Sequence, residues 1–265
     1  MTPGQQALVV AAGFVAGGIN GIAGGGSLVS FPALLALGQP ALTANVTSTV
    51  GIWPGYLGGV IGFRAEVRDQ GRRVRSLLPV TLAGSGLGAV LLLTTPSDAF
   101  EALAPFLILG ACVLFGVQPL LAGRVGEDPA GPAPTATETT EEPVPEPPRP
   151  GMVVQGATFL SSIYGGYFGA GLGVLLLAVF GTLLPDRLVR TTSLRTVLSL
   201  VTNTLAAGLF LVAAPVAWDA AGLLAGGALL GGFVGARVAR RIPGALLRTV
   251  VITIGVVGAA RLLLT

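Results

Sequence analysis

Long apolar segments alternate with short polar ones along almost the whole chain. Crossing the hydrocarbon core of a bilayer takes about 20 apolar residues in a helix. The pattern therefore predicts an all-α membrane protein built from two sets of segments, each with one short member. The first set is Gln5–Asn20, the short run Leu28–Leu37, Thr43–Phe63, Leu77–Thr94 and Ala99–Ala122. The second set is Met152–Tyr164, the short run Leu172–Leu184, Leu188–Val212, Ala217–Ala239 and Ala245–Leu264.

The two sets are copies of one another. Residues 21–48 recur as residues 166–193 at a constant offset of 145 and without a gap. The identical pairs include Gly24/Gly169, Gly26/Gly171, Pro40/Pro185 and Ser48/Ser193. Later pairs, such as Gly84/Gly231 and Gly88/Gly235, follow at an offset of 147. Internal repeats that glycine interrupts at corresponding places are typical of secondary transporters, in which the substrate binds where the breaks meet.

One segment breaks the apolar pattern. Residues 127–150 read EDPAGPAPTATETTEEPVPEPPRP, a composition that predicts a disordered or polyproline-like linker. We interpret it as a passive tether, with a regulatory or docking role as the alternative. The chain is thus divided into a first transmembrane repeat over residues 1–123, a linker over 124–150 and a second repeat over 151–265.

Arginine placement predicts that the two repeats are inverted. The loop after the third segment carries five arginines between Arg64 and Arg75, whereas its counterpart at 213–216 carries none. Two further loop pairs reverse the imbalance, with the arginines at 187–190 and 237–241. The positive-inside rule places arginine-rich loops in the cytoplasm. We therefore expect a cytoplasmic linker and both termini outside. Each repeat then has five crossing segments, or three full spans plus a re-entrant pair, and the sequence leaves both options open.

Composition narrows the function. Only 10% of residues are charged, against about 25% in a soluble domain, so the chain is predicted to be an integral protein of the lipid bilayer. A net charge of +3 is too small and scattered for nucleic acid. Histidine is absent, Cys112 is the single cysteine, and no acidic pair lies within a span. We therefore expect no enzyme, no metal site and no cofactor.

The two glycine breaks are the first candidate site. Backbone that leaves the helix at membrane depth must be buried in protein or face a water-filled cavity. The short helix after each break starts with unpaired N–H groups and the positive end of its dipole. Two such ends are predicted to bind an anion, with Ser27 capping one of them. The alternative is that glycine only allows close helix packing, our interpretation for Gly51, Gly55, Gly59, Gly84, Gly88, Gly227, Gly231 and Gly235.

Polar residues inside the spans complete the prediction. Arg195 lies about two helical turns inside an apolar segment, where a charge is costly and marks a substrate pathway by default; a snorkelling arginine or a helix–helix hydrogen bond is the alternative. It shares a helix face with Thr192, Ser199 and Thr202. Arg190 is predicted to be a gate or access residue, or else an interface anchor. The full predicted substrate-binding set is Arg195, Gly24, Gly25, Gly26, Ser27, Asn45, Ser48, Gly169, Ala170, Gly171, Thr192, Ser199 and Asn203.

These motifs resemble a known family. The runs NGIAGGGSLVSFPALL at 20–35, ANVTS at 44–48 and GYFGAGLG at 166–173 together resemble the TauE/SafE family of sulfite and organosulfonate exporters. The resemblance covers the chain outside the linker. It implies an alternating-access carrier in the bacterial plasma membrane that exports sulfite, sulfoacetate or a similar sulfonate. Ala170 and Leu172 depart from the fuller glycine run of the family, which leaves the substrate open.

Three other readings remain beside this one. They are an anion channel, a carrier of a small carboxylate or other organic anion, and, as the weakest, a membrane enzyme. The sequence also leaves the oligomeric state open, with a homodimer as one outcome.

Overall fold

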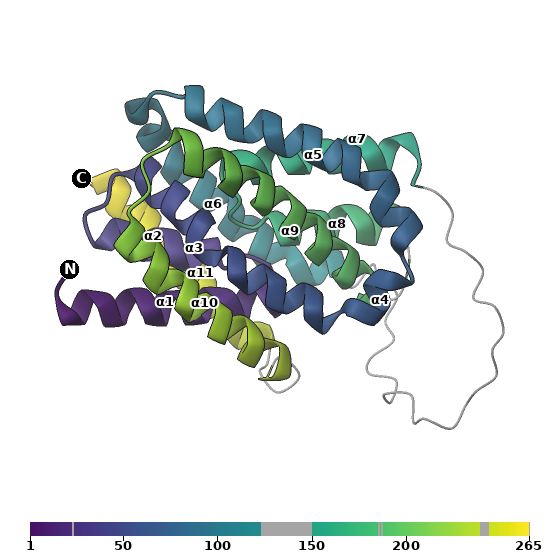
Figure 1. Ribbon diagram of the computed structural model, residues 1–265, viewed down its shortest axis with the longest axis horizontal. Helices are drawn as coiled ribbons and strands as arrows, with labels where there is room; N and C mark the ends of the chain where they lie inside the picture. Colours follow the sequence, from purple (N-terminus) through teal and green to yellow (C-terminus); the bar gives the residue numbers. More distant parts are fainter. Residues whose placement is uncertain (23, 123–149, 185, 187, 239–243, 265) are drawn as a thin grey trace.

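The computed structural model describes residues 1–22, 24–122, 150–184, 186, 188–238 and 244–264 (Figure 1). All but the last residue of the predicted linker lies outside these ranges. The regular elements within them are helices. They are α1 (Pro3–Ile22), α2 (Ser27–Ala36), α3 (Ala41–Gly62), α4 (Arg64–Arg68), α5 (Gly71–Thr94), α6 (Ser97–Ala122), α7 (Met152–Tyr167), α8 (Leu172–Leu183), α9 (Leu188–Ala213), α10 (Trp218–Val238) and α11 (Gly244–Leu264).

The predicted all-α membrane class is confirmed. In the described part of the chain, three helical stretches are long and apolar enough to cross a membrane, at 71–94, 97–117 and 189–213, and shorter apolar helices accompany them. One boundary was wrong, because α5 begins at Gly71 rather than Leu77. The extra turns and the unpredicted α4 are rich in arginine, which favours helix and keeps its charged head in water while the helix continues into the apolar region.

Small residues bring the helices of the two halves together. α1 packs along α10, and its counterpart α7 packs along α5. A Cβ added to Gly231 would collide with the carbonyl oxygen of Phe14, and one added to Gly84 with that of Phe159. These two contacts are related by the sequence repeat. The packing role is confirmed for Gly51, Gly55, Gly59, Gly84, Gly88, Gly227 and Gly231; the side-chain position of Gly235 lies outside the described residues.

The counterparts α3 and α9 lie antiparallel. Gln70 Nε2, just beyond α4, donates to the Ser193 hydroxyl near the start of α9 (2.8 Å). Halfway along, Trp53 Nε1 donates to Thr204 Oγ1 (2.8 Å). Beyond the end of α9, the Ala217 N–H donates to Thr47 Oγ1 near the start of α3 (3.0 Å). Corresponding helices that run in opposite directions are compatible with two inverted repeats.

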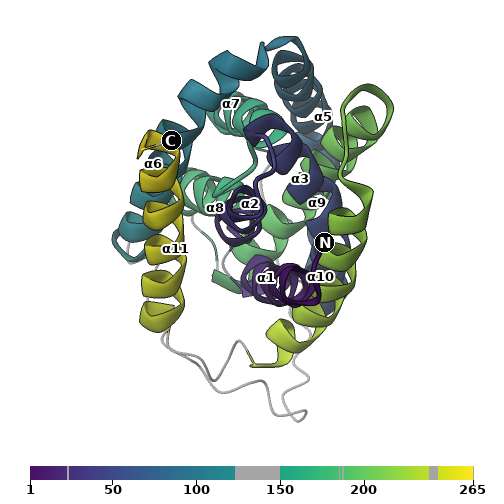
Figure 2. The same ribbon diagram turned by 90° about the vertical axis from the view of Figure 1, so that its left-hand side faces the viewer.

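The two short helices occupy the middle of the bundle. Viewed from its end, the bundle shows α2 and α8 within a ring of longer helices (Figure 2), and in the side view α2 lies toward one end of the bundle and α8 toward the other (Figure 1). They have 10 and 12 residues, so each rises only about 15–18 Å, roughly half of a hydrocarbon core about 30 Å thick. Their length favours the option of three full spans plus a broken pair in each half.

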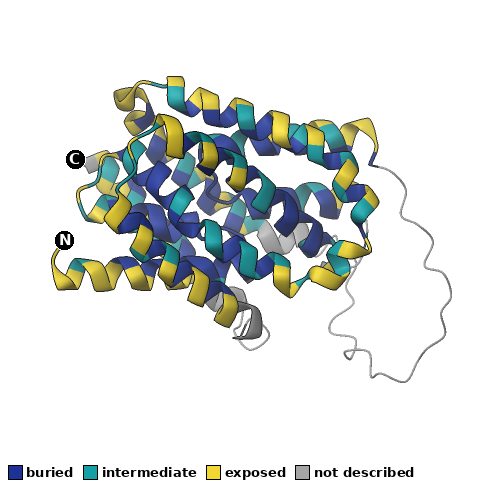
Figure 3. Cartoon of the chain, viewed as in Figure 1, coloured by how far each residue is buried: buried dark blue, intermediate teal, exposed yellow. Residues whose placement is uncertain are grey.

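The pattern of burial is that of a helix bundle in a membrane. The interior is buried and the outer helix faces are exposed (Figure 3). Those outer faces carry large apolar side chains, among them Phe106, Val153 and Val212, which are 64%, 70% and 89% exposed. A soluble monomer rarely exposes so much continuous apolar surface, whereas lipid covers it without cost.

Candidate functional site

The two glycine breaks share a left-handed first glycine but differ at the N-cap, where Gly26 has φ −57° and Gly171 has φ +80°. Gly24 and Gly169, which the repeat relates, have φ of +69° and +77°, values that glycine adopts without a steric cost. Their N–H groups both return to the carbonyl five residues earlier, on Ile19 (3.0 Å) and Tyr164 (3.2 Å). The helix that follows each break also starts alike, because the Val29 and Val174 N–H groups donate to the carbonyls of Gly26 (2.9 Å) and Gly171 (3.0 Å).

The breaks meet in the middle of the bundle with Arg195 beside them. A Cβ added to Gly173 would lie 2.7 Å from the Cα of Gly24 and 2.7 Å from Arg195 Nη1. Arg195 is 1% exposed. An arginine at the centre of a bilayer-spanning helix costs about 2.5–3.5 kcal/mol on insertion scales. Its position beside both chain breaks makes Arg195 the centre of the candidate site.

The predicted cap at Ser27 was wrong. Gly26 precedes α2 as its N-cap, and no side-chain hydroxyl caps the helix. Instead Asn20, at the end of α1, accepts hydrogen bonds on Oδ1 from the N–H groups of Gly25 (3.1 Å) and Gly26 (2.7 Å). Ser27 is buried as the first residue of α2. It lies one position after the N-cap, so its hydroxyl does not take the N-cap role.

The second break differs from the first. Within the described residues, no hydrogen-bond partner accepts from the N–H groups of Gly171 or Gly173. The repeat places Gly165 where the first half has Asn20, so the second half has no side chain to cap this helix. Buried N–H groups without a partner are rare in proteins. The start of α8 therefore offers two backbone donors, and Gly173 lies beside Arg195.

Polar side chains of α9 and α3 add to the site. Ser199 Oγ and Thr202 Oγ1 are buried without a hydrogen-bond partner among the described residues. Asn203 donates through Nδ2 to the Ser199 carbonyl oxygen (3.0 Å). The Tyr56 hydroxyl interacts with the Asn203 side chain and with the charge of Arg195. Hydroxyl and amide donors around an arginine match the oxygens of a small oxyanion.

Two predicted residues make side-chain contacts between helices, and a third is half-buried. Asn45 donates through Nδ2 to the carbonyl oxygen of Tyr167 (3.1 Å) and so joins α3 to α7. The hydroxyls of Ser48 and Ser30 lie 2.6 Å apart and join α3 to α2. Thr192 is half-buried on α9, and its carbonyl accepts from the Thr196 hydroxyl.

Arg190 lies at the end of the bundle, away from the breaks. Its Nε is 3.5 Å from Asp186 Oδ2, and Arg73 Nη1 pairs with the same carboxylate oxygen. Gln70 donates to the Arg190 carbonyl oxygen (3.0 Å). These contacts join the start of α5 to the start of α9. The position suits the predicted gate or the alternative interface anchor.

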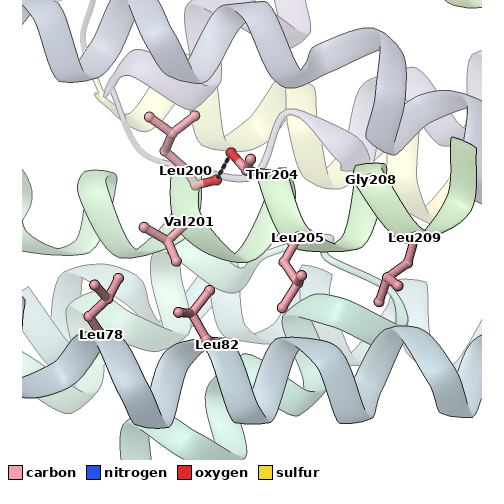
Figure 4. A pocket seen from close by; sticks show the side chains of 8 residues that line it. All are labelled: Leu78, Leu82, Leu200, Val201, Thr204, Leu205, Gly208 and Leu209. Carbon is pink, nitrogen blue, oxygen red and sulfur yellow. Dashed lines mark hydrogen bonds between the residues drawn. The ribbon is translucent and has the colours of Figure 1, made fainter.

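Two cavities lie away from the breaks, and the first of them is almost wholly apolar. One, of about 480 Å³, lies between α5 and α9 and is lined by leucine, valine and glycine with Thr204 (Figure 4). The Thr204 hydroxyl already donates to the Leu200 carbonyl oxygen (2.7 Å). The other, of about 420 Å³, is at the end of α2 beside Glu101 and Arg261. Among the described residues, no group of histidine, cysteine or acidic side chains could hold a metal ion.

Sequence reasoning missed Asn20 and Tyr56 as parts of the site. Both are buried, with 2% and 3% of their surface exposed. Asn20 lies in the last turn of the apolar helix α1, shortly before the glycine run. A polar residue at that depth could have been recognised from the sequence as part of the site. Tyr56 gave a weaker signal, because a tyrosine in an apolar segment more often packs with its hydroxyl at a membrane interface.

Comparison with known proteins identifies the family of the chain. The family model described as "Sulfite exporter TauE/SafE" matches residues 9–262. The chain belongs to the TauE/SafE family. No solved structure matches the chain.

Relatives of this TauE/SafE protein match over nearly their full length. A probable membrane transporter protein ORF9 of Sinorhizobium sp. is 29% identical over 97% of this chain and 92% of its own. A probable membrane transporter protein of Haemophilus influenzae is 26% identical over 97% and 93%. The probable membrane transporter protein YfcA of Escherichia coli K12 is 27% identical over 94% and 86%. Family and apolar helices together make this protein a multi-pass membrane transporter.

Proposed function

We propose that the protein carries a small sulfur oxyanion or sulfonate, such as sulfite or sulfoacetate, out of the cell across the bacterial plasma membrane. The observation that carries the proposal is the position of Arg195, buried where the two breaks meet. The guanidinium presents a planar fork of donors that matches oxyanion geometry. The family description adds sulfite as the first substrate to test.

Several neighbours of Arg195 support an anion rather than a cation. The second break offers the N–H groups of Gly171 and Gly173, and α9 offers the hydroxyls of Ser199 and Thr202. The carboxylates of the described residues all occupy exposed or half-exposed positions, away from the fully buried Arg195. A site with donors and one positive charge favours a negative solute.

Export follows from the membrane potential. One elementary charge is worth about 2.3 kcal/mol per 100 mV, and a negative interior drives an anion outward without further coupling. In the proposed topology the ends of the chain are outside and the linker inside. Gln70 joins the arginine-rich segments 64–75 and 186–190 at one end of the bundle, which supports a single cytoplasmic end, whereas Arg240 and Arg241 lie outside the described residues.

The experiment is transport in liposomes that contain the purified protein. Radiolabelled sulfite and sulfoacetate are loaded, and efflux and counterflow are measured with small carboxylates as competitors. A carrier saturates and shows counterflow, whereas an anion channel shows a flux that rises with concentration without saturating. Arg195→Gln is expected to abolish transport. Arg68→Gln is the matched control, because it removes the same charge from an exposed position; equal activity in both variants would remove Arg195 from the site.

A further inference from the structure

The amide of Asn20 is fixed in an unusual way. Its oxygen accepts two backbone hydrogen bonds, from Gly25 and Gly26 at the start of α2. Two donors to one oxygen hold the plane of the amide group. Asn20 is 2% exposed, and its Nδ2 has no hydrogen-bond partner among the described residues. A buried donor of this kind, held in place with nothing to donate to, points to a ligand.

The free side of this amide faces the candidate site. Asn20 Oδ1 holds the N–H groups of Gly25 and Gly26, and a Cβ added to the preceding Gly24 would collide with Arg195 Nη1. The first break therefore places Asn20, near the end of α1, and Arg195, on α9, around one small space, and the Tyr56 hydroxyl interacts with the Asn20 and Asn203 side chains and with the charge of Arg195. All four side chains are at least 97% buried, so bulk water does not compete for their donors.

We propose that Asn20 binds the transported anion through Nδ2, with the Tyr56 hydroxyl as a second donor to it. This inference rests on the proposed function and assigns two more residues to the same site. Asn20 Oδ1 takes up the N–H groups of Gly25 and Gly26, directly before α2, and Nδ2 presents a donor to the site. Hydrogen bonds in series strengthen one another, so the two backbone donors polarise the amide that contacts the anion.

The arrangement makes the two halves of the site unequal. The repeat puts Gly165 at the position of Asn20. The space that a side chain would need there is filled, because an added Cβ would lie 2.6 Å from a Leu172 methyl and 2.9 Å from the Thr202 methyl. The first half therefore contributes a side-chain amide, and the second contributes backbone N–H groups directly. One anion is bound per chain, between unlike partners.

The test is sulfite binding to the purified full-length protein, measured by calorimetry beside thermal unfolding. Asn20→Asp keeps an acceptor for Gly25 and Gly26 but replaces the donor with a negative oxygen. We expect sulfite affinity to fall at least tenfold with little loss of thermal stability. Gln6→Glu is the matched control, the same exchange of amide for carboxylate at an exposed position on α1, and is expected to bind sulfite as the wild type does.

Tyr56→Phe provides a second measurement that does not depend on how Asn20→Asp folds. It removes one hydroxyl at almost constant volume, and we expect a threefold to tenfold loss of sulfite affinity. If the wild type binds sulfite and Tyr56→Phe and the folded Asn20 variant bind it equally well, the inference is wrong and the proposed function stands. If the wild type binds neither sulfite nor sulfoacetate, the proposed function itself fails.

Discussion

Adding a single methyl group at Gly173 tests the central geometry. Gly173 is the second residue of α8 and has an ordinary helical conformation, so Gly173→Ala introduces no backbone strain of its own. The new Cβ would lie 2.7 Å from the Cα of Gly24 and 2.7 Å from Arg195 Nη1. The arginine head can move aside because its side chain is flexible. The backbone of Gly24 cannot move without shifting the start of α2.

The magnitude follows from two opposing effects. Carbon atoms in contact prefer about 3.5–4.0 Å, so the two breaks must separate by roughly 1 Å. Overpacking of this kind costs about 1–3 kcal/mol, while replacing glycine by alanine in a helix returns about 1 kcal/mol. We expect a net loss of about 0–2 kcal/mol in unfolding free energy. The functional loss is larger, because misplacing a binding group by about 1 Å can lower the rate about a hundredfold.

The assay pairs sulfite transport in liposomes with thermal unfolding of the purified protein. Gly156→Ala is the control, since this glycine is also helical and an added Cβ there meets nothing within 4 Å. It should raise stability slightly and leave transport intact. If Gly173→Ala transports sulfite at the rate of Gly156→Ala, the two breaks do not form the site.

Further predictions concern the contacts that hold the site in place. Ser48→Ala removes the hydrogen bond to Ser30 and should cost about 1 kcal/mol, read from chemical denaturation. Trp53→Phe removes the indole hydrogen bond to Thr204 and should cost a similar amount by the same measurement. Arg73→Gln should cost about 1–3 kcal/mol, less than the 3–5 kcal/mol of a fully buried pair, because Asp186 keeps its second arginine; no change in thermal unfolding would contradict this.

Much of the fold follows from the sequence for identifiable reasons. The apolar segments predicted the long helices because a membrane-spanning helix must satisfy its own backbone and bury or coat its surface with apolar side chains. Glycines at 24 and 169 predicted the breaks because only glycine adopts their positive φ freely. The α4 helix and the first turns of α5 were missed because hydropathy reports only the apolar part of a helix.

The site was predicted less completely, and the reasons are geometric. Arg195 and the glycine breaks were recognised because a charge and a run of glycine stand out in an apolar context. Which side chain holds the first break depends on a contact between the end of α1 and the chain before α2, so Asn20 was overlooked and Ser27 was chosen. Asn45 and Ser48 are polar at the right depth, but their partners are on other helices, which spacing along one chain does not reveal.

The close approach of the breaks bears on how transport works. Gly24 and Gly173 come so near that not even a Cβ fits between them. An anion that reaches Arg195 from one side of the membrane and leaves on the other must therefore push α2 and α8 apart. These helices belong to different halves of the chain and attach to long helices that run in opposite directions. Separating them shifts one half against the other, and that motion is what alternating access requires. An open pore needs no such displacement, so this packing favours a carrier over a channel.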